Sequence, residues 1–483
     1  MYVWETEATK RKVSSRTSSL LRCFLILAFL LADGHSASAL PLLTAKVRAL
    51  PAFARKYGMP CSSCHEAWPK LSPFGQTFKD NGYQMGNERD APIFQSPAYW
   101  PVTFRITPIW HRESLGRVAV DAPGGASEAR VTTHGFDWSG LDFHTAGTLA
   151  NNVSFYVLPS SNSAGAFHFE SVWARLDNLL GSSWLNIKLG KFELDNLLSE
   201  KRILALSTYG GVYQNYHFQP ATETASPLPI PFVIGIGDNQ VGAEWMGHSK
   251  DGRTRISAAL LSANDGQFGL PTSRGYNGFF AASQAFEAGS LGLQRVGVFG
   301  YLGQAPTYFQ YTSAGAGLAG TGVGNKSYYR AGFIGMWYLK KLDFTTVYFR
   351  GWDSAFLGTG TPANSPTGLP AGAKAPVWNG GLIETHYNWN PQLILINRVE
   401  TVRMSRQALP VVAGPFAPGV SVPSDNFGDI DVATVGFRYY PFISSRAGFA
   451  FHNEFSIFRQ RRTSSTGLDI INSSALIGFD FAF

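Results

Sequence analysis

Large apolar side chains alternate with small or polar ones near the end of the chain. Ile477, Phe479 and Phe481 are apolar, whereas the residues between them are glycine or aspartate. Residues 447–460 and 430–441 repeat the alternation, with aromatic side chains near the segment ends. Because successive side chains of a strand point to opposite faces, each segment predicts a β-strand with one apolar face.

The same alternation recurs throughout the chain after residue 101, where no amphipathic helix stands out. An apolar outer face, a polar inner face and aromatic girdles are typical of an outer-membrane barrel, and the terminal Phe483 agrees with this class. We therefore predict an all-β transmembrane barrel of about 16 antiparallel strands, in preference to a soluble β-sandwich. The predicted strands are 102–113, 138–150, 153–162, 167–179, 184–195, 238–249, 254–264, 275–287, 293–304, 327–339, 341–352, 375–390, 393–404, 430–441, 447–460 and 472–483.

The gaps between these segments alternate in length. Asn151-Asn152, Lys340 and Pro391-Gln392 leave room only for tight turns. Outer-membrane barrels have short periplasmic turns and longer outer loops, so this parity fits a barrel with both chain ends in the periplasm. The longest gaps are rich in Gly, Pro, Ala and Ser and are predicted as loops: 114–137, 196–237, 305–326, 353–374 and 405–429.

Composition agrees with a barrel and excludes other classes. Only 15% of the 483 residues are charged, 14% are aromatic and 51 are glycine, while the mean hydropathy is −0.05. The body of the chain has no long apolar run, which excludes a helical membrane protein. Three cysteines exclude a disulfide scaffold. The net charge of +7 is mild and not clustered, so nucleic acid is not an expected partner.

Residues 1–39 have the parts of a cleaved export signal. Five basic residues precede or adjoin the short apolar stretch Cys23–Leu31, and Ala37-Ser38-Ala39 matches a cleavage site. The alternative is an N-terminal anchor helix, but the apolar stretch is too short to span a bilayer. Removing these residues, which include five basic and three acidic side chains, changes the net charge from +7 to about +5.

Cys61-Ser62-Ser63-Cys64-His65 is a C-x-x-C-H motif, the attachment pattern of c-type haem. Two thioethers reach the vinyl positions of one porphyrin edge, and the adjacent histidine supplies the proximal nitrogen to iron. After export the motif contains every remaining cysteine. A thioredoxin-like pair lacks its βαβ context, and a zinc half-site lacks a second ligand pair. The motif predicts one covalent haem c held by Cys61 and Cys64, with His65 as the redox-active iron ligand.

Met85 is the candidate for the distal iron ligand. It lies 20 residues after His65, and Gly82 and Gly86 allow the chain to turn back towards the haem. Ligation by histidine and methionine raises the haem potential. Two alternatives stay open: Met85 packs against the haem or the barrel wall, or a histidine from the wall is the ligand.

Residues 40–100 form a haem segment between the export signal and the barrel, which spans 101–483. Pro73 suits the first turn of a helix with Ser72 as its N-cap, and Phe74 and Phe78 are spaced to share the helical face towards the porphyrin. Such a small segment buries a haem poorly on its own. Because a barrel of this size has a wide lumen, we expect the mainly helical segment to plug it.

The order of export signal, haem motif and barrel resembles the fused monohaem cytochrome–porins, among them the outer-membrane c-type cytochromes of acidophilic iron-oxidising bacteria. The resemblance is specific in the haem segment, and in the barrel it rests on length and pattern. The matching residues are Pro51-Ala52-Phe53-Ala54-Arg55, Cys61–His65, Pro69-Lys70-Leu71-Ser72-Pro73-Phe74-Gly75 and Phe78-Lys79-Asp80-Asn81-Gly82-Tyr83.

This resemblance implies an oxidoreductase that oxidises extracellular Fe(II) through one haem. The electrons would pass to a periplasmic acceptor that resembles rusticyanin, a blue-copper protein, or a soluble cytochrome c, and then to a terminal oxidase. The low charge content agrees with an acidic exterior. Two other functions stay open: a porin whose haem plug is structural or gates solutes, and outward electron transfer to extracellular acceptors.

Three pairs of histidine and carboxylate residues are spaced to share a barrel face. We interpret them as ordinary polar lining of the lumen, with guidance of iron as the alternative, because porin lumens are polar in any case. The pairs are His111 with Glu113, Asp142 with His144, and His452 with Glu454.

Overall fold

A computed structural model describes most of the chain after residue 52. The described residues are 53, 57, 59–67, 70–83, 85, 102–123, 125–150, 152–161, 165–195, 236, 239–263, 275–305, 310–311, 317–318, 326–354, 375, 377–390, 392–406, 429–443, 448–460 and 470–482. They belong to one compact unit, Val47–Phe483. The predicted export signal and Phe483 lie outside the described residues.

The described part of the haem segment is small and mixed. It contains α3 (Cys61–Cys64), β1 (His65–Ala67), β2 (Lys70–Leu71) and α4 (Pro73–Asp80). Strands β1 and β2 pair with each other as an antiparallel ribbon. Neither described helix is long and apolar enough to cross a membrane.

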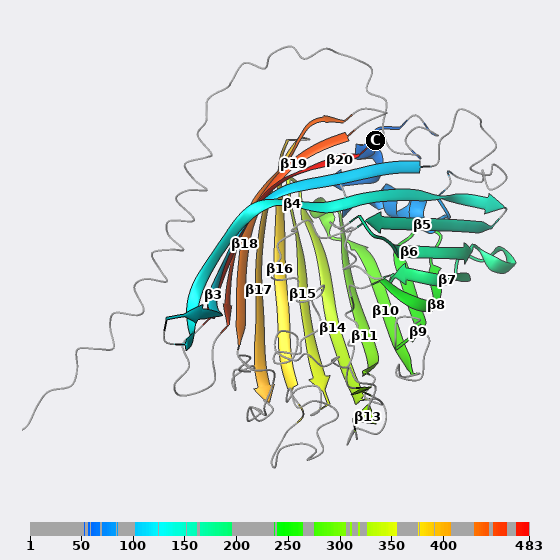
Figure 1. Cartoon of the computed structure of the whole chain (residues 1–483). Helices are drawn as coiled ribbons and strands as arrows, with labels where there is room; N and C mark the ends of the chain where they lie inside the picture. The colour runs from blue at the N-terminus through cyan, green and yellow to red at the C-terminus, as the bar shows by residue number, and fades with distance from the viewer. Residues whose placement is uncertain are drawn as a thin grey trace, which may run out of the picture. The chain divides into compact units, whose positions relative to one another are not determined.

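Sixteen of the described strands form a closed antiparallel barrel (Figure 1). Neighbours in sequence pair with each other, and β20 closes the barrel against β3. A small ribbon, β12 (Gln310–Tyr311) with β13 (Gly317–Leu318), lies in the connection from β11 to β14. The barrel strands are β3 (Val102–Ala122), β4 (Gly125–Ala150), β5 (Val153–Ser161), β6 (Phe167–Leu176), β7 (Asn186–Glu193), β8 (Asn239–His248), β9 (Thr254–Ser262), β10 (Tyr276–Glu287), β11 (Leu293–Ala305), β14 (Lys326–Leu339), β15 (Leu342–Asp353), β16 (Val377–Asn390), β17 (Leu393–Arg406), β18 (Ile430–Ile443), β19 (Gly448–Gln460) and β20 (Ile470–Ala482).

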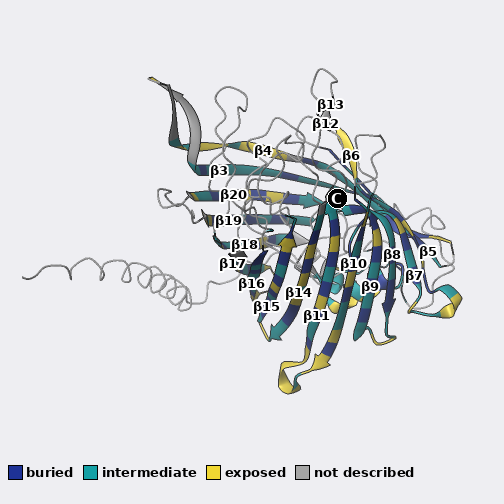
Figure 2. Cartoon of the chain, turned by 90° about the horizontal axis from the view of Figure 1, so that it is seen from below, coloured by how far each residue is buried: buried dark blue, intermediate teal, exposed yellow. Residues whose placement is uncertain are grey.

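The two faces of the strands differ as the alternation predicts, and Figure 2 shows the banding. On β20, Ile477 and Phe479 are 41% and 40% exposed, whereas Leu476 and Asp480 on the other face are 6% and 3% exposed. The exposed residues form an apolar outer face, and most buried charged side chains lie on the inner face. Within the closed wall no strand edge is left, so the backbone polar groups there are satisfied by neighbouring strands. A closed barrel with an apolar exterior spans an outer membrane, so the predicted class and location are confirmed.

The predicted strands agree with the observed ones within three residues, with one clear error. Residues 114–137, predicted as a loop, are mostly strand. There β3 and β4 continue to pair with each other, from Leu115 with Val131 to Ala122 with Gly125. The pairing of β3 with β20 begins at Ser114, so this part of the hairpin extends past the closed wall (Figure 1). A hairpin needs little burial, so its small and polar composition was misleading.

Candidate functional site

The C-x-x-C-H motif forms a single helical turn followed by a strand. The backbone N–H of Ser63 donates to the carbonyl of Pro60 at 2.9 Å, which closes the turn of α3. The two cysteine positions, three residues apart, therefore lie on one side of the turn. His65 starts β1 and pairs with Leu71 of β2. His65 and Cys64 are both partly buried.

Ser72 joins this turn to the next helix. Its backbone N–H donates to the carbonyl of Cys64 at 2.8 Å, and its hydroxyl donates to the carbonyl of Ser63 at 2.9 Å. The same hydroxyl accepts from the N–H of Gly75 at 3.1 Å and caps α4. The predicted N-cap and the place of Pro73 in the first turn are confirmed.

Gly75 allows α4 to lie directly on α3. A Cβ at this position would lie 1.9 Å from the carbonyl oxygen of Cys64 and 2.9 Å from its Cα. Any side chain here would collide with the motif backbone, so glycine is required by close approach. The two predicted phenylalanines differ: Phe78 is buried, whereas Phe74 is 39% exposed. Only Phe78 belongs to the apolar cluster, because Phe74 lies on the first turn of α4.

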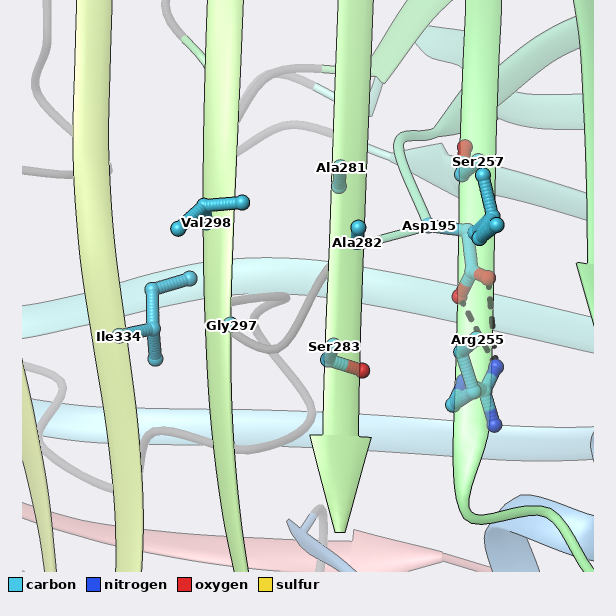
Figure 3. Close-up of a pocket in the computed structure, with 10 residues that line it drawn as sticks. Asp195, Arg255, Ser257, Ala281, Ala282, Ser283, Gly297, Val298 and Ile334 are labelled. Carbon is cyan, nitrogen blue, oxygen red and sulfur yellow. Dashed lines mark hydrogen bonds and ion pairs between the residues drawn. The ribbon is translucent and has the colours of Figure 1, made fainter.

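The carboxyl end of α4 makes charged contacts with the barrel wall. Asp80 is buried and forms an ion pair with Arg255 on β9, with 2.8 Å from Arg255 Nη2 to Asp80 Oδ1. Arg255 also contacts Asp195, which follows β7, at 3.2 Å (Figure 3). Burial raises the pKa of Asp80, but the charge and hydrogen bonds of Arg255 lower it more, so the pKa lies below its ordinary 3.8. The carboxylate therefore stays charged in moderately acidic solution.

The chain after α4 also contacts the wall. Thr148 on β4 donates to the carbonyl of Gly82 at 3.2 Å. Tyr83 has a left-handed backbone (φ 61°) and stacks on Trp173 of β6, with ring centroids 6.1 Å apart. Phe53 of the segment also stacks on Tyr83, with ring centroids 5.1 Å apart. The described contacts of the segment with the wall therefore include hydrogen bonds, ion pairs and aromatic packing.

These contacts share one end of the barrel. Thr148 on β4 and Arg255 on β9 lie within two residues of a strand end beside a short turn, and Trp173 lies three residues from the end of β6 on the same side of the barrel. A Cβ on Gly252, within the β8–β9 turn, would lie 4.0 Å from Thr77 of α4. Short turns face the periplasm in outer-membrane barrels. The haem segment therefore contacts the wall at the periplasmic end.

Met85 is partly buried and packs against the apolar cluster that contains Phe78 and Tyr83. This is the packing that the sequence left open as an alternative to iron ligation. The role of Met85 as a distal ligand stays a prediction.

The three histidine–carboxylate pairs lie on the wall, but they do not form a shared centre. His111 bonds to Ser474 at 2.9 Å, and His144 bonds to Tyr156 at 2.9 Å. His452 is buried 3.6 Å from Asp480. Among the described residues, no group of three or more His, Cys, Asp or Glu side chains has the geometry of a metal site. Their interpretation as polar lining agrees with these contacts.

A buried group on β15 and β16 was not among the residues predicted from the sequence. His386 contacts Asp343 at 2.8 Å through Nδ1 and Glu384 at 2.6 Å through Nε2. Glu384 and His386 are spaced like the three predicted pairs, so the same alternation would have found them. Asp343 comes from the neighbouring strand and has no such local signal. Both ring nitrogens of His386 contact carboxylates, so we interpret the group as a structural ion cluster.

The donor set of the motif fits a covalent c-type haem. Cys61 and Cys64 stand one turn apart, His65 follows directly, and the glycine at position 75 keeps the motif backbone against α4. The thiol and imidazole chemistry is that of haem attachment and iron ligation. Ser72 and Gly75 hold this arrangement. Both lie outside the C-x-x-C-H motif, so the motif alone does not predict their contacts with it.

Comparisons with known proteins concern the barrel. No protein-family model matches the chain, and no curated protein matches its sequence. Among solved structures, the anion-selective porin from Comamonas acidovorans is 10% identical with a TM-score of 0.48, over 79% of this chain and 99% of that one. The outer membrane channel DcaP of Acinetobacter baumannii is 9% identical with a TM-score of 0.45, over 81% and 99%. A loop L8 deletion mutant of OmpT, an outer membrane protein of Vibrio cholerae, is 12% identical with a TM-score of 0.44, over 79% and 99%.

Proposed function

We propose that this outer-membrane barrel is an iron(II) oxidase that carries electrons from extracellular Fe(II) to a periplasmic acceptor. The observation that carries the proposal is the C-x-x-C-H turn, which packs on α4, whose carboxyl end contacts the wall at the periplasmic end. The acceptor would be a rusticyanin-like copper protein or a soluble cytochrome c, as the family resemblance implies. The barrel then admits Fe(II) from its extracellular end.

One haem bound to Cys61 and Cys64 would supply one-electron redox chemistry, with His65 and the candidate Met85 as iron ligands. The residues of the chain orient this centre. Ser72 holds the motif carbonyls, Gly75 allows α4 to support the turn from behind, and the contacts of Asp80 hold α4 on the wall. Phe78 and Tyr83 anchor the segment through their buried aromatic rings.

In this proposal the segment stands between the donor and the acceptor. Fe(II) prefers oxygen and nitrogen ligands, and the inner face of the wall carries carboxylate and histidine side chains. The barrel wall itself is an insulator for electrons. A centre at the periplasmic mouth therefore receives iron through the lumen and is open to a protein acceptor from the periplasm.

The first test is anaerobic addition of Fe(II) to the purified full chain at acidic pH, followed through the haem absorption bands. We expect prompt reduction, reversed by an oxidised blue-copper protein or cytochrome c. Reduction by a strong chemical donor but not by Fe(II) would contradict the proposal, and it would favour solute transport or outward electron flow.

Met85→Ala tests the distal ligand separately. We expect the haem to stay attached, because Cys61 and Cys64 are intact, while the midpoint potential falls and reduction by Fe(II) is lost. Met246→Ala is the control, since this buried wall methionine is not a member of the apolar cluster against which Met85 packs. An unchanged spectrum and potential in Met85→Ala would show that the side chain only packs.

A porin for solutes is the second candidate, and the closed barrel of sixteen strands favours it. In that case the segment is a structural or gating plug. Conductance measurements in planar bilayers distinguish the two: steady passage of small solutes by the intact protein, together with no reduction by Fe(II), would support the porin.

A further inference from the structure

Two arginines of the barrel wall converge on the carboxyl end of α4. Arg255 on β9 holds the side chain of Asp80, and Arg175 on β6 holds the backbone. Arg175 is 1% exposed, and its Nη2 donates to the carbonyls of Lys79 at 2.8 Å and Asp80 at 3.3 Å. The last carbonyls of a helix have no intrahelical partner and carry its negative dipole end, so cations bind there favourably.

Both arginines are themselves held by wall carboxylates. Arg175 forms an ion pair with Asp177 through Nε, and Arg255 contacts Asp195 at 3.2 Å. Each guanidinium therefore has one partner in the wall and one in the segment. Buried charges of this kind are fixed in place by their partners, and removing one partner leaves the other charge unpaired in a buried site. The arrangement makes the segment an integral part of the wall's charge network.

The wall has a small hollow beside Arg255. Ser283 on β10 and Gly297 on β11 are small and line a hollow next to the Arg255–Asp195 pair (Figure 3). On the other side, Trp173 offers a flat ring to Tyr83 and lies 5.7 Å from the Arg175 guanidinium carbon. Trp173 therefore stacks on the segment next to Arg175, which binds the end of α4.

We propose that Arg175 and Arg255 are positioning residues that lock the haem segment onto the wall and so close the periplasmic end of the lumen. The lock keeps soluble iron out of the periplasm while it fixes the motif at the mouth. Closure of the lumen does not depend on the proposed function, whereas the separation of donor and acceptor by this closure rests on it. Both arginines act through α4 and do not touch the motif cysteines in any described contact.

Single-channel conductance of the full chain in planar bilayers tests the lock, with the haem midpoint potential as the second readout. Arg255→Gln and Arg175→Gln are expected to raise the conductance several-fold, because the segment leaves the wall. The same variants are expected to lower the midpoint potential, because a nearby positive charge is lost and water reaches the segment. Arg255→Lys, which keeps the charge, is expected to restore much of both values.

Arg253→Gln is the matched control. Arg253 lies two residues before Arg255, is 43% exposed and pairs with Glu287 and Asp251 in the turn region. Its loss is expected to leave conductance and potential as in the parent chain. Asp80→Asn removes the same ion pair from the segment side. It keeps the test decisive if a wall variant does not form a folded barrel, which is recognised by the different gel mobility of unheated and heated protein.

The outcomes separate the two proposals. Parental conductance and potential in folded Arg255→Gln, Arg175→Gln and Asp80→Asn would overturn the lock. A rise in conductance in a protein that carries no haem would support the lock and reject the iron oxidase. Haem reduction by Fe(II) that persists in all three variants, with parental conductance, would keep the oxidase and reject the lock.

Discussion

At the scale of single residues, a missing side chain is as important as the reactive ones. Gly75 sits against the carbonyl of Cys64, and no other residue fits that contact. Elsewhere, glycine in a helix lowers stability by about 1 kcal/mol relative to alanine. Here the balance is reversed, because overpacking costs about 1–3 kcal/mol and the clash is with backbone atoms that cannot rotate away.

Gly75→Ala is therefore expected to displace α3 from α4 and to lower the fraction of chains that carry covalent haem to well below that of the parent. Haem content per chain, measured by intact mass, checks this. Gly135→Ala on β4 is the control, since its Cβ would meet nothing within 4 Å. Full haem content in Gly75→Ala would contradict the reason given for this glycine.

At the scale of elements, α4 is held at both ends. Ser72 caps its start and ties it to the motif, and the two wall arginines hold its end. The helix has only eight residues, too few to be stable alone in water. Its position and order therefore depend on these contacts.

The end contact predicts a definite dependence on pH. A carboxyl whose pKa is lowered on folding stabilises the docked state above its ordinary pKa and loses that contribution as pH falls through the lowered value. Asp80 has such a lowered pKa, and the charged groups facing it are Arg255, Asp195, His248 and Arg175. Docking is thus expected to stay constant from neutral pH down to about pH 4 and to weaken only below it.

Protease protection of the segment, measured across this pH range, checks the expectation. Asp80→Asn is expected to show weaker protection at neutral pH and a smaller further loss in acid. A steep loss of protection between pH 7 and 5 in the parent chain would contradict the assignment, because Asp80 does not titrate there.

At the scale of the whole molecule, the barrel is closed by a long-range seam. Strand β20 pairs with β3 between Ser473–Ser114 and Ala482–Arg105, so the last strand depends on the first. Residues 118–129 of the β3–β4 hairpin lie beyond this seam, and their ladder pairs are with each other. Barrel closure and hairpin extension are therefore separable.

Replacing residues 118–129 with an Asn-Gly turn is expected to leave the barrel folded. The turn suits a tight hairpin, and the seam pairs are all retained. The shift in gel mobility between unheated and heated protein, which reports the folded barrel, should equal that of the parent chain. A matched deletion of residues 473–482 from β20 is expected to abolish the shift, because it removes the seam. Loss of the shift in the hairpin variant would show that the extension is needed for closure.

Local chemistry allowed much of this protein to be predicted from its sequence. Period-two alternation is a property of each strand by itself, so strands such as β16 and β20 were placed nearly residue by residue. The C-x-x-C-H spacing and the Ser72-Pro73 helix start are likewise local. The error at 114–137 arose because small and polar residues are compatible with both a loop and an extended hairpin.

What holds the segment to the barrel was decided only by the tertiary structure. Asp80 and Arg255 are 175 residues apart, and Arg175 reaches the backbone of residue 79 from a distance of 96 residues. No spacing rule links such positions, since they meet only after the barrel has closed. Sequence alone thus determined which faces are apolar and where the predicted haem motif lies along the chain, because these are short-range properties. The fold decided where the motif stands and what holds it there, because ion pairs and close backbone contacts depend on distances that the chain sets only when folded.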